Sequence, residues 1–226
     1  MNSPRRFDRT MKRFVTIMVG ILCVVPMLAQ DMKTVFVAMP DSIAPLLTKV
    51  NREDCIDFLA SNMAAKVQTR FGSVAEMKVL TDDYTLMQIS PVSTMELKLL
   101  PLNDSTKVIC MVKTVSATAS DSDVRFYTSD WKEKLDARSF FSKPQASDFF
   151  LPTGSLTDEE ALLVKKADMH LMKASLSKDS ATLAFAYTTP DYLNKEDREK
   201  LSPYLRKEPL VLRWEQGKFV RQGDIQ

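Results

Sequence analysis

Few residues in this chain have the types and spacing that catalysis or metal binding requires. The chain has one histidine, His170, which excludes sites that need two histidines, such as the helical zinc pattern His-Glu-x-x-His. Ser129 to Lys132 and Ser175 to Lys178 both match Ser-x-x-Lys, in which a serine nucleophile faces a lysine one helical turn away. The second match falls at an expected hairpin, and no Lys-Thr-Gly follows. We therefore assign no catalytic residue.

The acidic residues do not form a recognisable site either. Asp121 and Asp123 flank a serine, but a calcium loop needs further carboxylates and a glycine. Glu53 and Asp54 stand near the start of an expected helix, where negative charge is favourable without any catalytic role. The two acids of a glycoside hydrolase can lie far apart in a chain, so a carboxylate-based hydrolase stays open as an alternative. No metal site and no cofactor are expected.

The N-terminal segment has the three parts of a secretory signal peptide. Two basic residues precede an apolar run over residues 14–29, and Ala29 stands where a signal peptidase would cut, before Gln30. A transmembrane helix needs about 20 apolar residues, so cleavage of residues 1–29 is expected rather than anchoring. Residues 1–10 read as an extension upstream of the true start, because Met11 begins a complete signal.

Cleavage changes the charge balance of the chain. The whole sequence has 31 basic and 29 acidic residues, and residues 1–29 hold five of the former and one of the latter, so the mature chain carries a formal charge of −2. No basic stripe remains that would favour nucleic acid. No second apolar span follows, so no transmembrane segment is expected in the mature chain. Its composition, with 45% apolar and 27% charged residues in the whole chain, is that of a globular protein.

Two cysteines, Cys55 and Cys110, remain after cleavage. An exported protein meets an oxidising compartment, so a disulfide between them is one alternative. The other is a pair of buried thiols, because Cys55 lies on the apolar face of an expected helix and Cys110 in an apolar strand. The second interpretation is preferred.

The hydrophobic period changes along the chain and divides it into two halves and a connector. The first half, residues 30–130, combines helices with an antiparallel sheet. Its expected helices and strands cover, in order, residues 41–48, 51–72, 77–80, 84–90, 94–100, 107–115 and 124–128. In the strand 94–100, Glu96 and Lys98 alternate with apolar residues, which predicts one solvent-facing side.

The connector, residues 131–156, is unusually rich in aromatic residues and contains prolines. Exposed aromatic side chains often mark interaction surfaces. We therefore hypothesise an interaction patch made by Tyr127, Trp131, Phe140 and Phe141. The alternative is that this segment packs down onto the domain, in which case those side chains are buried.

The second half, residues 157–226, shows a helix, a hairpin, a second helix and a second hairpin. Thr157 begins a capping box, and Asn194 caps the second helix. The hairpins are expected over residues 169–188 and 210–220. The fold class is therefore α+β, with antiparallel sheets built from hairpins and helices packed on one face.

The two halves share one local pattern. Residues 95–105 and 169–180 both run from a strand into a turn that ends in Asp-Ser, and each half begins with a helix. A duplication that made two similar halves and two unrelated ordinary hairpins both remain open.

Asp-Ser followed by a small or apolar residue occurs three times, at Ser42, Ser105 and Ser180. This pattern resembles the O-glycosylation acceptor of exported proteins in the Bacteroidetes group. Asp and Ser also favour turns and helix caps, which is the alternative explanation. We hypothesise a glycan on at least one of these serines, since surface loops host such modification.

Several short phrases along the chain carry a wider resemblance. They are Met39-Pro40-Asp41-Ser42, Leu97-Lys98-Leu99-Leu100-Pro101, Ile109-Cys110-Met111-Val112 and Tyr187-Thr188-Thr189-Pro190. Together they resemble an uncharacterised family of exported proteins from Bacteroidales, catalogued as a domain of unknown function. The resemblance covers residues 32–220 and implies a Gram-negative envelope location. It brings no activity and no site residues.

Two functional hypotheses follow. The first is a non-catalytic module of the periplasm or outer membrane that binds or scaffolds another envelope component, either a protein or a glycan. The alternative is a carboxylate-based hydrolase acting on a periplasmic polymer. The hydrolase requires a cleft with two converging acids, one of them with a perturbed pKa.

Overall fold

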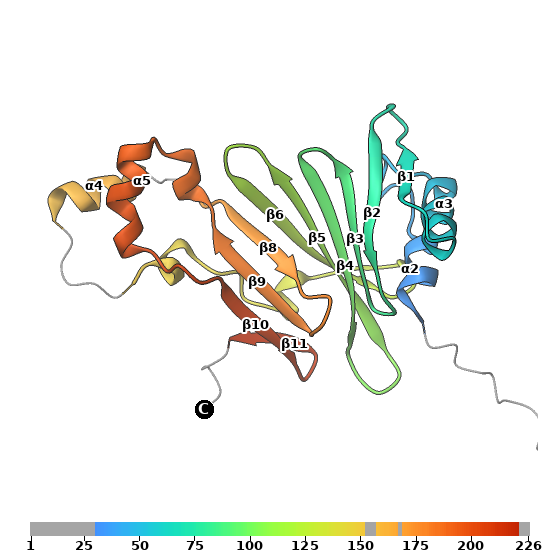
Figure 1. The fold of residues 1–226 in the computed structure, drawn as a ribbon. Helices are drawn as coiled ribbons and strands as arrows, with labels where there is room; N and C mark the ends of the chain where they lie inside the picture. The colour runs from blue at the N-terminus through green and yellow to red at the C-terminus, as the bar shows by residue number, and fades with distance from the viewer. Residues whose placement is uncertain (1–29, 152–156, 167–168, 222–226) are drawn as a thin grey trace, which may run out of the picture.

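The computed structural model describes residues 30–151, 157–166 and 169–221 (Figure 1). Within these residues, seven strands form an antiparallel meander in sequence order, which we call the large sheet. Its strands are β1 (Ala65–Gln68), β2 (Val74–Leu80), β3 (Tyr84–Ser90), β4 (Ser93–Pro101), β5 (Lys107–Ser116), β6 (Ser120–Thr128) and β7 (Lys134–Leu135). The strands expected from the sequence in this region are confirmed, with ends that differ by a few residues.

A second antiparallel sheet, the small sheet, follows in the order β11-β10-β9-β8. Its strands are β8 (Met172–Leu176), β9 (Thr182–Tyr187), β10 (Leu210–Glu215) and β11 (Lys218–Arg221). The helices α4 (Asp158–Lys166) and α5 (Lys195–Leu201) pack against each other at the end of the molecule farthest from the N-terminal helices (Figure 1). Asn194 caps α5 as expected, since its side chain accepts a hydrogen bond from the Asp197 amide at 2.9 Å.

The helices α2 (Met32–Ala38) and α3 (Lys49–Ala60) cover one face of the large sheet. Thr48 and Asn51 form a capping box at the start of α3, so Asn51 is the third residue of the helix rather than its cap. The expected extension of this helix to residue 72 is wrong, because residues 65–68 alternate between buried and exposed as a strand does. The helix expected over residues 41–48 is a series of turns, and α2 was not anticipated.

The small sheet covers the opposite face of the large sheet. Leu100, Cys110 and Phe126 from the large sheet share a buried cluster with Phe185 and Leu212 from the small sheet. Strands β4 and β5 are therefore covered on both faces. The molecule has three layers, in the order helices, large sheet and small sheet.

This layering corrects the expectation of a solvent-facing side on the fourth strand. Glu96 and Lys98 are 7% and 3% exposed, because the small sheet lies over them. The helices are also placed differently from the prediction, since among the described α-helices only α2 and α3 lie on a face of the large sheet. The two sheets differ in strand number and share one core, so the structure gives no support for two similar halves.

Candidate binding site at one rim of the large sheet

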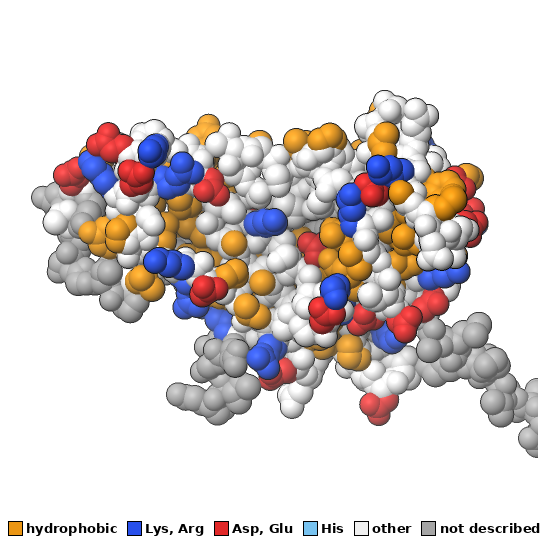
Figure 2. All heavy atoms as spheres, viewed as in Figure 1, with side chains coloured by type: hydrophobic (Ala, Val, Ile, Leu, Met, Phe, Trp, Pro, Cys, Tyr) orange, Lys and Arg blue, Asp and Glu red, His pale blue; other side chains and the backbone are white. Residues whose placement is uncertain are grey.

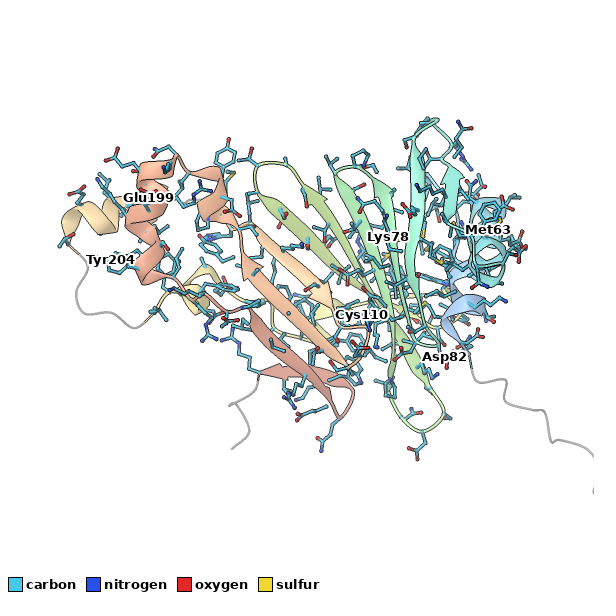
Figure 3. All side chains as sticks on the ribbon, viewed as in Figure 1. Met63, Lys78, Asp82, Cys110, Glu199 and Tyr204 are labelled. Atoms are coloured by element: carbon cyan, nitrogen blue, oxygen red, sulfur yellow. The ribbon has the colours of Figure 1, made fainter. Side chains whose placement is uncertain are left out.

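The turns of a meander alternate between the two ends of its sheet. The turns 69–73, 91–92 and 117–119 lie at one end, which we call the loop rim (Figure 1). The turns 81–83, 102–106 and 129–133 lie at the other end, which we call the acidic rim. Asp82, labelled in Figure 3, belongs to the acidic rim.

The turns of the loop rim contain no carboxylate and one charged residue, Arg70. Residues 69–73 read Thr-Arg-Phe-Gly-Ser, residues 91–92 Pro-Val, and residues 117–119 Ala-Thr-Ala. Four large apolar side chains at this end are more than half exposed, and separate hydrophobic patches lie among white atoms along the top edge of Figure 2. They are Phe71 at 81%, Val74 at 56%, Val92 at 53% and Val115 at 59%.

A cavity of about 230 Å³ opens beside the loop rim, and we call it the rim pocket. Residues 44–47, from the segment between α2 and α3, form one wall. Ile89 of β3, Met95 of β4, and Lys113 and Val115 of β5 line the remainder. The Arg70 amide donates to the Leu46 carbonyl at 3.1 Å, which joins the pocket wall to the first turn of the loop rim. The pocket lining exposes mainly carbon.

Lys113 is the charged group of the rim pocket. Its ammonium donates to the Ile43 carbonyl, which leaves further N–H groups for other acceptors. Burial lowers the pKa of Lys113, and the positive charge of Arg125 lowers it further, whereas Asp123 on the neighbouring strand acts in the opposite direction. An anionic group entering the pocket would meet this cation.

Arg52 holds the wall of the rim pocket in place. Its side chain is 2% exposed, and it donates from Nη1 to the Leu47 carbonyl at 2.6 Å and to Asp41 Oδ1 at 3.0 Å. Nη2 donates to the Met39 carbonyl. The planar guanidinium thereby fastens residues 39–47 to α3. Sequence reasoning missed Arg52, although its position on the same helix face as Cys55 and Ile56 could have identified it as buried.

Side chains of the large sheet cap the open edge of β8. Alternate backbone amides of β8 point away from β9. The amides of Met172, Ala174 and Leu176 donate to Asp121 Oδ1 at 3.3 Å, Ser122 Oγ at 2.9 Å and Glu96 Oε2 at 2.9 Å, respectively. An uncapped edge would expose unpaired backbone groups, so these acceptors stabilise the contact between the sheets. Asp121, considered above for calcium, is one of these acceptors.

The pKa of Glu96 is perturbed, as the hydrolase hypothesis requires of one acid, but Glu96 is buried between the two sheets. Burial raises its pKa, while hydrogen bonds from the Leu176 amide and the Tyr84 hydroxyl act against that rise. The Tyr84 hydroxyl lies 3.0 Å from Glu96 Oε2. Both donors belong to the core between the sheets, so Glu96 has a structural role. Lys98, its neighbour on the same face, pairs with Asp83 at 2.8 Å.

The interaction patch expected from the aromatic residues is corrected by the structure. Tyr127, Trp131, Phe140 and Phe141 are all less than 10% exposed. The Trp131 indole donates to the Val35 carbonyl at 2.8 Å, so this side chain is fixed against α2. Phe140 and Phe141 belong instead to the core between the sheets, where Phe140 stacks on Phe126 with ring centroids 4.5 Å apart. The described part of the connector, residues 131–151, therefore contributes Trp131, Phe140 and Phe141 to the core.

The disulfide considered above is also corrected. Both thiols are free and buried. Cys55 lies in the core under the helices, whereas Cys110, labelled in Figure 3, lies between the two sheets, so the large sheet separates them. Burial raises the pKa of Cys55 to about 11. Both cysteines are buried thiols, as the preferred interpretation predicted.

The remaining predicted residues lie at the surface or outside the described residues. Ser42, Ser105 and Ser180 are exposed and occupy turns, so a glycan on them stays a prediction. Ala29 lies outside the described residues, and Gln30 is the first residue within them. His170 is exposed.

Two properties concern the described part of the chain as a whole. Among the described residues, no three His, Cys, Asp or Glu side chains lie close enough together to hold a metal ion. No described helix is both long and apolar enough to cross a bilayer.

By its fold, the chain is an antiparallel α+β protein, with helices on one face of a large sheet and a small sheet on the other. A family model described as "Protein of unknown function (DUF3256)" matches residues 24–219, so the chain belongs to this family. It is also similar to a solved structure described as "Structure of a domain of an uncharacterized protein from Porphyromonas gingivalis W83". The identity is 31%, the TM-score is 0.76, and the match covers 86% of this chain and 100% of that chain. No curated protein matches.

Proposed function

We propose that this protein is exported to the Gram-negative envelope and acts there as a non-catalytic binding module. The rim pocket is its binding site, and it takes an apolar group of another envelope component. The observation that carries this proposal is an opening lined mainly by carbon with one cation, Lys113, beside exposed apolar turns. Exposed apolar surface of this kind typically marks a site of interaction.

The chemistry of the rim pocket favours an apolar ligand over a glycan. A glycan needs convergent polar groups that satisfy its many hydroxyls, whereas the pocket exposes little polar surface. Lys113 suits an apolar group that carries a negative charge at one end, because its ammonium is part of the wall. The proposed ligand class is therefore an apolar group with an adjacent anion.

The binding proposal is tested with the fluorescent probe anilinonaphthalene sulfonate, which combines an apolar ring system with one negative charge. Its fluorescence is expected to rise to saturation on titration with the folded protein. Lys113→Met should raise the Kd about tenfold, because a charge-assisted contact is lost. Leu46→Ser should weaken binding by a similar factor, since Leu46 lines the pocket.

Two matched variants serve as controls for the probe titration. Lys178→Met removes an exposed lysine, and Val211→Ser an exposed apolar side chain, both away from the pocket. Neither should change the Kd. Partly folded proteins also bind this probe, so near-ultraviolet circular dichroism is used to check that each variant keeps its tertiary structure. Equal affinity in Lys113→Met, Leu46→Ser and wild type would overturn the proposal.

Export is tested by the intact mass of the protein recovered from the cell envelope. Cleavage after Ala29 predicts a chain that begins at Gln30, and a mass that retains residues 1–29 would contradict it. Any added mass that disappears when Ser42, Ser105 and Ser180 are all changed to Ala would identify the proposed glycan. A mass equal to the bare polypeptide contradicts glycosylation.

A further inference from the structure

The loop rim presents its apolar side chains on separate turns. Phe71 stands at the tip of the β1–β2 hairpin, where Gly72 follows with a φ of 82°. Val92 lies in the β3–β4 turn and Val115 next to the β5–β6 turn. At 81%, the exposed fraction of Phe71 is the highest among the exposed large apolar side chains of the described residues. A phenyl group exposed to this extent would gain free energy on entering an apolar phase, because its apolar surface would leave water.

Charges of both signs lie near the loop rim, because Asp41 contacts Arg70 and the exposed Asp121 lies opposite Val115 on β6. Arg70, half exposed, is the only charged residue within the three turns. It contacts Asp41 at 3.4 Å, and both side chains are exposed to solvent, where such a pair is weak and its arginine can exchange partners. The turns of the acidic rim, by contrast, hold five carboxylates against one lysine: Asp82, Asp83, Asp104, Asp130, Glu133 and Lys132. The turns themselves therefore carry a formal charge of +1 at the loop rim and −4 at the acidic rim.

We propose that the loop rim docks on the surface of a phospholipid membrane. The turn carrying Phe71 inserts at the level of the headgroups together with Val92, and Arg70 pairs with lipid phosphate. The acidic rim points away, because an anionic bilayer repels carboxylates. This inference rests on the proposed envelope location and names the component that the binding module meets.

A membrane fits the loop rim better than a protein partner does. Protein interfaces combine a packed apolar centre with a polar rim and about one hydrogen bond per 100–200 Å². The three turns instead separate their apolar side chains with small Ala, Ser and Thr residues. A fluid layer of acyl chains accommodates separate tips of this kind without matching their shape. Docking would also bring the rim pocket to the membrane surface, since Arg70 and Leu46 join the two.

The test is flotation of the cleaved protein with vesicles of three parts phosphatidylethanolamine to one part phosphatidylglycerol. Wild type is expected to float with the vesicles. Phe71→Ser should reduce the bound fraction about tenfold, as the loss of an inserted phenyl group predicts. Arg70→Gln should reduce it less, and added salt should remove most of the Arg70 contribution. Vesicles without phosphatidylglycerol should bind more weakly.

Matched variants away from the loop rim complete the design. Val211→Ser removes an exposed apolar side chain from β10, and Asp82→Asn removes a carboxylate from the acidic rim. Neither should lower flotation. Wild type that stays unbound, or Phe71→Ser that floats as well as wild type, would overturn the inference. Crosslinking of position 71 to an envelope protein, without flotation, would assign the loop rim to a protein partner and also overturn it.

The probe titration separates this inference from the proposed function. If vesicles do not bind but anilinonaphthalene sulfonate enters the rim pocket, the membrane inference fails and the proposed function stands. If the probe does not bind either, the proposed function fails as well. Phe71→Ser should leave the Kd of the probe unchanged, because Phe71 does not line the rim pocket.

Discussion

The two rims of the large sheet differ in what their side chains contact. Turns of the acidic rim are fastened to other parts of the molecule. The Trp214 indole donates to the Pro101 carbonyl at 2.7 Å, Lys98 pairs with Asp83 at 2.8 Å, and the Met32 amide donates to the Asp82 carbonyl at 2.8 Å. The turns of the loop rim leave their largest side chains in solvent.

This difference separates stability from binding along the large sheet. A side chain that satisfies buried partners contributes to folding, whereas an exposed side chain contributes little. Changes near the acidic rim or in the core should therefore lower the free energy of unfolding. Changes to the turns of the loop rim should lower binding and leave the free energy of unfolding nearly unchanged.

Arg52→Met is expected to have the largest effect. It should change both stability and binding, because Arg52 is buried in the core and also holds the wall of the rim pocket. The free energy of unfolding should fall by about 3–5 kcal/mol, since several buried carbonyls lose their donor. Probe binding should weaken too, because residues 39–47 lose their attachment to α3. Denaturant unfolding measures the first quantity and fluorescence titration the second.

Arg70→Met is the matched control for that variant. Arg70 also pairs with Asp41, but its side chain is half exposed. The loss should stay below about 1 kcal/mol, as for other exposed ion pairs. Equal losses in the two variants would show that the buried hydrogen bonds of Arg52 do not hold the pocket wall.

Glu96→Ala should lower the free energy of unfolding by about 2–4 kcal/mol. The Leu176 amide and the Tyr84 hydroxyl would lose their acceptor inside the core. Flotation should not change, because Glu96 is remote from the loop rim. A loss below about 1 kcal/mol would show that the capped edge of β8 contributes little to the contact between the sheets.

Glu96→Gln tests the pH dependence of the same contact. Burial raises the pKa of Glu96 in the folded protein, so the folded state holds this proton to higher pH than the unfolded state does. The stability of wild type relative to Glu96→Gln should therefore fall as pH rises above the ordinary carboxyl value of 4.5. It should level off above the folded-state pKa. A constant difference across that range would contradict the raised pKa.

Trp214→Phe compares the two rims directly. The variant keeps a ring but removes the N–H that donates to Pro101, so a loss of about 1 kcal/mol is expected in denaturant unfolding. Phe71→Ser at the loop rim should change stability by less than about 0.5 kcal/mol. The opposite order of the two losses would contradict the assignment of the acidic rim to stability.

The smallest expected effect is that of reducing agent. Because the large sheet separates Cys55 from Cys110, the cleaved and unreduced protein should titrate two thiols after unfolding. Dithiothreitol should leave the midpoint of thermal unfolding unchanged. Absence of reactive thiols in the unfolded, unreduced chain would show that a disulfide had formed.

Local patterns in the sequence predicted much of the secondary structure. The strands between residues 77 and 128 and the two later hairpins follow from alternating apolar residues separated by turn residues, both of which are short-range features. The boundary of α3 was predicted less well, since residues 61–68 are apolar enough to continue a helix until β1 pairs with β2. The family resemblance was also readable from the sequence, and the match over residues 24–219 confirms it in its coarse form.

The candidate site could not be predicted in the same way. The rim pocket joins residues 44–47, Ile89, Met95 and Lys113, which become neighbours only when the meander pairs in register. The prediction of an exposed aromatic patch was wrong for the same reason. Aromatic residues in an irregular segment carry no local signal of burial, and only the small sheet decides that Phe140 and Phe141 are covered.

The sequence by itself determined the antiparallel α+β class and the composition of each turn, and it predicts an export signal. These properties depend on residues that are close together in the chain. The tertiary structure decided which faces of β4 and β5 are shielded from solvent, which turns share a rim, and which charged side chains are buried. The shared rims depend on the pairing of the whole meander, and the burial of Arg52 depends on residues 39–47. The burial of Glu96 and Lys98 depends on a second sheet that begins 76 residues after Glu96, at Met172, and no local pattern records where that sheet packs.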